Sequence, residues 1–272
     1  MKSLALLACT VLASCSTAVV ETMPRVSIAA NSSGLDVSEF QPHGPKQLLG
    51  GASDLNGKPL PPDIPSGTSA RISRLHPLHN TEPRYVTPAS GNLQVVSIEG
   101  AASYRGMPEN IRSWRNFTDS SQPLGKDDLV RLKQEQTRGN EIPWVNAAPC
   151  FHAKLRRESF PWGNAVLFLT SYVQGATGGP VNNDMLVLVV QGFTHDGRYA
   201  VNGHFEIRHP ALPDSLWDKR ARQKTYFDID DETAQAEAWL DQQDDASFRP
   251  GIATYLELLR ALKIEAGEPF KP

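Results

Sequence analysis

Residues 185–199 read Met185-Leu186-Val187-Leu188-Val189-Val190-Gln191-Gly192-Phe193-Thr194-His195-Asp196-Gly197-Arg198-Tyr199, and this run indicates the fold class most directly. Its first six residues are all apolar, which is typical of a central strand covered on both faces. Asp196-Gly197 is a strong signal for a two-residue type I′ hairpin turn with a positive φ at the glycine. The sequence therefore predicts that the chain reverses here and continues as a neighbouring antiparallel strand.

The strand after the turn has two different faces. Its inward positions are predicted to be Tyr199, Val201, Gly203, Phe205 and Ile207. The residues between them, Ala200, Asn202, His204, Glu206 and Arg208, form a solvated face because side chains alternate with a period of two. The sequence thus predicts a sheet with one wet face near His204.

Other segments complete an α+β prediction. Strands are expected at 93–98, at 150–156 with Phe151, Ala153 and Leu155 inward, and at 165–173, where both faces are apolar. Helices are expected at 126–138, from Asp230 to about Gln243, and from Arg249 to Ala266. The predicted fold is a mostly antiparallel sheet built from hairpins and covered by two or three helices.

The sequence divides into three parts. Residues 1–14 read as a signal peptide, 15–90 as an extended tether, and 91–272 as a single α+β domain. The tether prediction rests on proline, since residues 19–90 hold 10 of the 21 prolines and few regular apolar patterns. Within it, a stretch near Tyr85-Val86 is expected to dock on the domain, and a loop-rich subdomain is the alternative.

The N-terminus predicts a lipid anchor. Lys2 precedes an apolar run from Leu4 to Leu12, which is shorter than the roughly 20 residues that span a bilayer. The run ends Leu12-Ala13-Ser14-Cys15, which resembles the bacterial lipobox, so Cys15 is expected to become the lipidated N-terminus. Ser16 resembles the signal that sends lipoproteins to the outer membrane, facing the periplasm. The alternative is a plain secretory peptide cut near Ala18.

Several runs carry a family resemblance: Thr170-Ser171-Tyr172-Val173-Gln174-Gly175, Pro180-Val181-Asn182-Asn183, the run from Gln191 to Val201, and His209-Pro210-Ala211-Leu212-Pro213. With them, the segment from Ile142 to Pro213 resembles an extracytoplasmic domain of uncharacterised bacterial secreted proteins and lipoproteins. The resemblance implies an envelope compartment and a sheet, and no mechanism. In its order of elements the chain is also similar, at the level of fold, to the photosystem oxygen-evolving subunit P family.

Charge and motifs exclude several function classes. With 27 Lys+Arg against 30 Asp+Glu, the net charge of −3 does not favour binding to nucleic acid. Cys150 and His152 lack a recognisable third catalytic group, and His76 and His79 lack further ligands at metal spacing. The acidic stretch from Asp228 to Asp245 has no glycine bend for a calcium loop. We expect no cofactor and no metal site.

Two sets of residues remain as candidates for a functional site. Gln174, Asn182 and Asn183 lie on a long loop between central strands, where neutral amides suit a partner backbone or a glycan, although they can equally tie the loop to itself. His204 and Glu206 are weak catalytic candidates on the wet face.

These candidates lead to two hypotheses about function. The first is a non-catalytic envelope lipoprotein that binds an envelope protein or glycan. The alternative is an envelope hydrolase acting on wall or glycan material. A pocket that brings together His204, Glu206 and Arg156 would favour the hydrolase.

The lipobox prediction is testable at Cys15. Cys15→Ser removes the thiol that takes the lipid, so we expect the protein to leave the membrane fraction or to stay as unprocessed precursor. Palmitate labelling and fractionation measure this. A mature, palmitate-labelled Cys15→Ser protein in the membrane fraction would show that the lipid is attached elsewhere.

Overall fold

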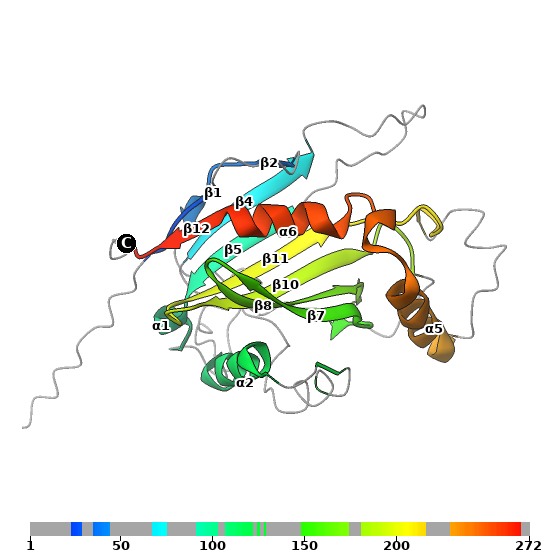
Figure 1. Cartoon of the computed structure of the whole chain (residues 1–272), viewed down its shortest axis with the longest axis horizontal. Helices are drawn as coiled ribbons and strands as arrows, with labels where there is room; N and C mark the ends of the chain where they lie inside the picture. The colour runs from blue at the N-terminus through cyan, green and yellow to red at the C-terminus, as the bar shows by residue number, and fades with distance from the viewer. Residues whose placement is uncertain are drawn as a thin grey trace, which may run out of the picture.

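A computed structural model describes residues 23–28, 35–43, 67–74, 91–102, 107–121, 124–125, 128, 148–173, 181–215 and 229–267. The described residues form an eight-stranded sheet in the order β2-β4-β5-β11-β10-β8-β7, with β3 also paired to β4, and every pairing is antiparallel (Figure 1). Its strands are β2 (Leu35–Val37), β3 (Gln41–His43), β4 (Gly67–Arg74), β5 (Gly91–Ser97), β7 (Ala153–Phe160), β8 (Gly163–Thr170), β10 (Val187–Thr194) and β11 (Tyr199–Glu206).

Helices cover both faces of this sheet. The helices are α1 (Ile98–Ala102), α2 (Met107–Asp119), α5 (Ile229–Gln242) and α6 (Ile252–Ala261), with a 3₁₀ turn, η1 (Asp245–Ser247). Figure 1 shows α6 running across the sheet and α2 on its other side. The α+β class with a mostly antiparallel sheet is therefore confirmed. None of the described helices is long and apolar enough to cross a membrane.

The central strands supply two hydrophobic cores because their side chains alternate between faces. In β8, Leu167 and Leu169 lie in the core beneath α5 and α6, which we call the α6-side core. Val166 and Phe168 lie in the core beneath α1 and α2, the α2-side core. The predicted covering of this strand on both faces is confirmed.

Helix α6 is attached to the sheet by stacking and by hydrogen bonds. The Tyr255 ring stacks on Phe205 with centroids 4.8 Å apart, and its hydroxyl donates to the Glu206 carbonyl oxygen at 2.6 Å. The Trp162 indole N–H donates to the Leu259 carbonyl oxygen at 2.8 Å. The Tyr255 contacts position the end of β11, where Glu206 lies.

The hairpin from β10 to β11 forms as predicted, but its turn is of another type. The pairing runs from Val187 opposite Glu206 to Phe193 opposite Ala200. The Gly197 N–H donates to the Thr194 carbonyl oxygen at 2.8 Å, and Gly197 has a φ of 68°. Asp196 has no positive φ, so the two-residue type I′ prediction is wrong. A hydrogen-bonded turn with a glycine in the left-handed conformation at its end is typical of hairpin loops longer than two residues.

Strand β7 contains a bulge that the alternation rule missed. Phe151 and Ala153 lie in the α6-side core as predicted, but Leu155 packs against the α2-side core. The register shifts between Ala153 and Arg156, and Lys154 has a φ of 55°. Because a bulge inserts one extra residue, it reverses the faces of the side chains beyond it.

Both chain ends of the described region join the folded body. Strand β1 (Arg25–Ile28) pairs with β12 (Leu262–Glu265), and a small sheet pairs β6 (Ala148–Pro149) with β9 (Tyr172–Val173). The predicted last helix therefore ends at Ala261, and a strand follows it. Although the apolar residues after Ala261 continue the helical spacing, the pairing of Leu262–Glu265 with β1 favours a strand there.

The predicted tether also contributes strands. Strands β2, β3 and β4 extend the main sheet from β5, so the domain does not begin at residue 91, and that boundary is corrected. The remaining parts of the predicted tether, at 15–22, 29–34, 44–66 and 75–90 with Tyr85-Val86, lie outside the described residues, as does nearly all of the predicted helix at 126–138.

Gly197 provides a stability test of the hairpin. We predict that Gly197→Val lowers the free energy of unfolding by about 1–3 kcal/mol, the usual cost of forcing a side chain into such a backbone conformation. A Cβ at Gly197 would also come within 2.9 Å of Arg115 Nη2. Gly251→Ala is the control, since Gly251 has a φ of −61° and a Cβ there would lie 3.6 Å from its nearest neighbour. Urea unfolding measures both, and an unchanged midpoint in Gly197→Val would contradict the turn.

Candidate functional site

The face of the sheet that carries α2 changes from apolar to polar along β11. Ala200 lies in the α2-side core, and Asn202, two residues on, is buried and polar. His204 and Glu206 follow on the same face and are partly buried. Polar side chains therefore continue the face beyond the part that α1 and α2 cover.

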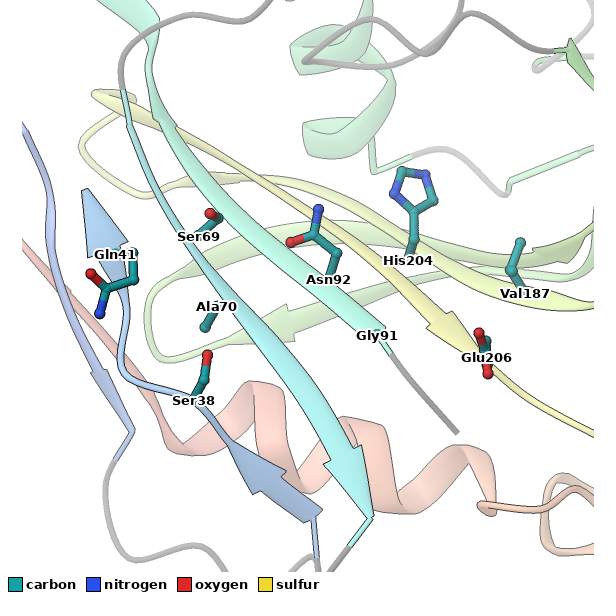
Figure 2. A pocket seen from close by; sticks show the side chains of 9 residues that line it. All are labelled: Ser38, Gln41, Ser69, Ala70, Gly91, Asn92, Val187, His204 and Glu206. Carbon is teal, nitrogen blue, oxygen red and sulfur yellow. The ribbon is translucent and has the colours of Figure 1, made fainter. Parts of the chain in front are cut away.

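A pocket lies on this polar part of the sheet. Its volume is about 750 Å³, and we call it the sheet-face pocket (Figure 2). It is lined by Ser38, Gln41, Ser69, Ala70, Gly91, Asn92, Val187, His204 and Glu206. The pocket thus combines residues from β3, β4, β5, β10 and β11 with Ser38, which precedes β3.

The strand register explains why these side chains converge. His204 lies opposite Asn92 of β5 and Val189 of β10. Residues directly opposite one another in antiparallel strands point to the same face. Ser69 of β4 likewise lies opposite Gln41. Figure 2 shows Ser69, Asn92 and His204 projecting from the same side of the sheet.

His204 is held in place by an aromatic neighbour. Its Nε2 lies 3.2 Å from the Tyr172 hydroxyl, and the two rings meet edge to face with centroids 5.6 Å apart. Tyr172 belongs to β9, outside the main sheet, so the small β6–β9 sheet fixes the imidazole from the side. A positioned imidazole next to a carboxylate can bind a hydroxyl group or move a proton.

A second row of amides lies deeper on the same face. Gln191 lies opposite Asn202, which lies opposite Gln94, and Gln94 lies opposite Ser69. Gln191 is fully buried and Asn202 is 2% exposed. Among the described residues, no donor reaches the Asn202 side-chain oxygen, Oδ1. A buried acceptor without a donor is costly, so this row adds an unused acceptor beside the pocket.

The structure brings some of the predicted site residues together and separates others. His204 and Glu206 share the sheet-face pocket. Arg156 lies elsewhere, where its Nη1 is 2.6 Å from an Asp245 carboxylate oxygen. The three-residue set expected for a hydrolase is therefore not assembled. Cys15 and Gln174 lie outside the described residues.

Asn182 and Asn183 tie loops together. Asn183 accepts from the His209 N–H at 2.7 Å and donates to the carbonyl oxygens of His209 and Leu212, both at 3.2 Å. The Asn182 side-chain oxygen accepts from the Asp184 N–H at 3.1 Å. Both asparagines are buried. These bonds assign them a structural role, and their predicted role in binding stays a prediction.

The acidic residues of α5 have a structural role too. Glu237 accepts a hydrogen bond from the His152 N–H at 2.9 Å, and Asp241 accepts one from the Lys154 N–H at 2.6 Å. These carboxylates cover backbone donors at the edge strand β7, which would otherwise invite pairing with another chain. Within the described ranges, no cluster of three or more His, Cys, Asp or Glu residues could hold a metal ion.

The sequence pattern did not predict the pocket residues that lie in the first half of the chain. Ser38, Gln41 and Ser69 lie in the segment predicted as tether. One signal was available, because Ala70 and Ile72 alternate with Arg71 and Ser73, as in a half-buried strand.

Searches of protein-family models, curated proteins and solved structures find no match to this chain.

His209 is a buried imidazole in surroundings that favour its neutral form. Its Nδ1 accepts from the Ala211 N–H at 3.2 Å, and its Nε2 lies 3.0 Å from the Ser247 hydroxyl oxygen. The Trp239 and Phe248 rings pack against it. Burial, together with the positive charge of Arg249, lowers the pKa of His209 below its usual value of 6.5. A proton on Nδ1 would also break the bond from Ala211.

We predict a loss of stability in mild acid that depends on His209. A lowered pKa in the folded state means that full stability is present above pH 6.5 and is lost as the pH falls through the folded-state pKa. The melting temperature should fall between pH 7.5 and 5.5, and less so in His209→Gln. His195→Gln, at an exposed turn position, is the control. An identical pH dependence in His209→Gln and wild type would contradict the prediction.

Proposed function

We propose that this protein is a lipid-anchored binding module of the bacterial cell envelope, placed at the outer membrane and facing the periplasm. Acyl chains on Cys15 hold it at the bilayer, and the sheet-face pocket binds another envelope component. The observation that carries the proposal is the pocket itself, in which β3, β4, β5 and β11 present hydrogen-bonding side chains on a part of the sheet that none of the described helices covers. Pockets with a few convergent polar groups are the usual binding sites of folded domains.

The anchor and the folded body are close in sequence. Arg25, the first residue of β1, follows Cys15 by ten positions (25 − 15). A fully extended chain of that length spans at most about 35 Å. Since β1 pairs with β12, which directly follows α6, the link to the body is short. The proposal therefore places the domain near the membrane surface and not at the end of a long tether.

Binding is favoured over catalysis by the composition of the pocket. Four of its side chains, Ser38, Gln41, Ser69 and Asn92, are neutral hydrogen-bonding groups. Such groups recognise a ligand without transferring protons. An envelope hydrolase remains the second candidate, because His204 and Glu206 line the same pocket and could act as base and acid.

The experiment measures retention on envelope material. Detergent-solubilised full-length protein is mixed with washed envelope fragments from a double-membraned bacterium and sedimented. The combined Asn92→Ala and His204→Ala change should raise the apparent dissociation constant at least about fivefold, since two hydrogen bonds contribute about 1–3 kcal/mol.

The matched control is Asn164→Ala. Asn164 lies at the other end of the same sheet face and donates to Asp119 at 3.2 Å. Equal retention of all proteins would contradict the proposal. Release of soluble fragments by wild type and not by Glu206→Gln would instead favour the hydrolase.

A further inference from the structure

We infer that the ligand of the sheet-face pocket is a neutral, hydroxyl-rich sugar unit of an envelope glycan. This inference rests on the proposed function and specifies the chemistry of its ligand. It is argued from the hydrogen-bonding groups, the charge and the surface geometry of the pocket.

The hydrogen-bonding groups match hydroxyls. The amides of Gln41 and Asn92 each offer both donors and acceptors, and the hydroxyl of Ser69 does the same. None of the hydrogen bonds among the described residues engages these three side chains. Sugar hydroxyls also donate and accept, so neighbouring hydroxyls on a ring can pair with an amide at both of its ends.

The balance of charge excludes strongly charged ligands. Glu206 is the one carboxylate among the described lining residues, which include no Lys or Arg. Arg71 lies opposite Asn92 in the strand register, and counting its positive charge together with that of Glu206 leaves a sum of zero. Phosphate groups require several cationic or backbone donors, and polyamines require several carboxylates. A neutral ligand fits this balance.

The position of the pocket argues against an extended peptide. Peptides usually bind to sheets by adding a strand at an exposed edge, with hydrogen bonds between main chains. The central lining strands β4, β5, β10 and β11 are each paired on both sides, so their backbone groups are used in the ladder. Recognition on this face therefore falls to side chains, which suits hydroxyl groups better than a peptide backbone.

The surface also offers an apolar contact. Val187 lies among the polar lining residues, opposite Glu206 in the strand register. Adjacent strands are about 4.8 Å apart, a spacing comparable with the width of a pyranose ring. A ring lying across the strands can bond to Asn92 and His204 while its C–H face rests on Val187.

The test titrates detergent-solubilised full-length protein with defined probes by calorimetry. The sugar probes are the N-acetylglucosamine tetrasaccharide and maltotetraose, and the charged probes are inorganic phosphate and spermidine. We expect at least one sugar probe to bind, with the dissociation constant raised at least about fivefold in Asn92→Ala and in Gln41→Ala. Asn164→Ala should bind as wild type does. Gln41 is exposed, so its variant keeps the test valid if Asn92→Ala unfolds.

Each outcome has a distinct meaning. Sugar binding that is weakened in the pocket variants and unchanged in Asn164→Ala supports the inference. Sugar binding that is equal in all variants overturns it, as does binding of phosphate or spermidine alone. If no sugar binds while retention on envelope fragments still depends on Asn92 and His204, the glycan inference fails and the proposed function stands, with a protein partner as the remaining ligand. If no sugar binds and wild type and the Asn92→Ala and His204→Ala variant are retained equally on envelope fragments, both the glycan inference and the proposed function fail.

Discussion

The antiparallel pairing of β8, β10 and β11 is the interaction on which the rest of the structure depends. These strands carry apolar side chains on both faces, so each face has to be covered. Helices α5 and α6 cover one face, and α1 and α2 cover part of the other. Beyond the part of the face that packs against α1 and α2, the residues of β11 on that face change from Ala200 to Asn202, His204 and Glu206. The pocket thus forms because α1 and α2 cover only part of this sheet face, and because the side chains of β11 change from apolar to polar beyond that part.

The edges of the sheet show how the fold limits unwanted pairing. At β7, carboxylates of α5 take up backbone donors, and the bulge at Lys154 bends the strand. At the opposite edge, β2 and β3 are short. The β1–β12 pair joins the beginning and the end of the described chain. Among the described residues, these features make the edges poor surfaces for pairing, while the part of the sheet face beyond α1 and α2 offers side chains for recognition.

Local signals predicted the central part of the fold well. The apolar runs at 165–173 and 185–190 and the Asp196-Gly197 pair were sufficient to predict two central strands and a hairpin. The face of Leu155 could not be predicted, because a bulge depends on a backbone conformation at Lys154 that no residue type demands. The strand after Ala261 depends on a partner more than 200 residues away, which periodicity within a window cannot detect.

The site was predictable only in part for the same reason. His204 and Glu206 follow from alternation along a single strand. Gln41 and Ser69 enter the pocket because β3 pairs with β4 and β4 pairs with β5, which are contacts between segments distant in sequence. The amide-rich composition of the loop with Asn182 and Asn183 predicted a binding site, yet both side chains form hydrogen bonds within and between loops.

The central claim is that the uncovered sheet face is the recognition surface. Amide hydrogen exchange of the full-length protein, with and without envelope fragments, tests it most directly. The account predicts slower exchange in peptides that cover residues 35–43, 67–74, 91–97 and 199–206, with no change in those that cover α6. Protection confined to α6, or an exchange pattern identical in both samples, would contradict it.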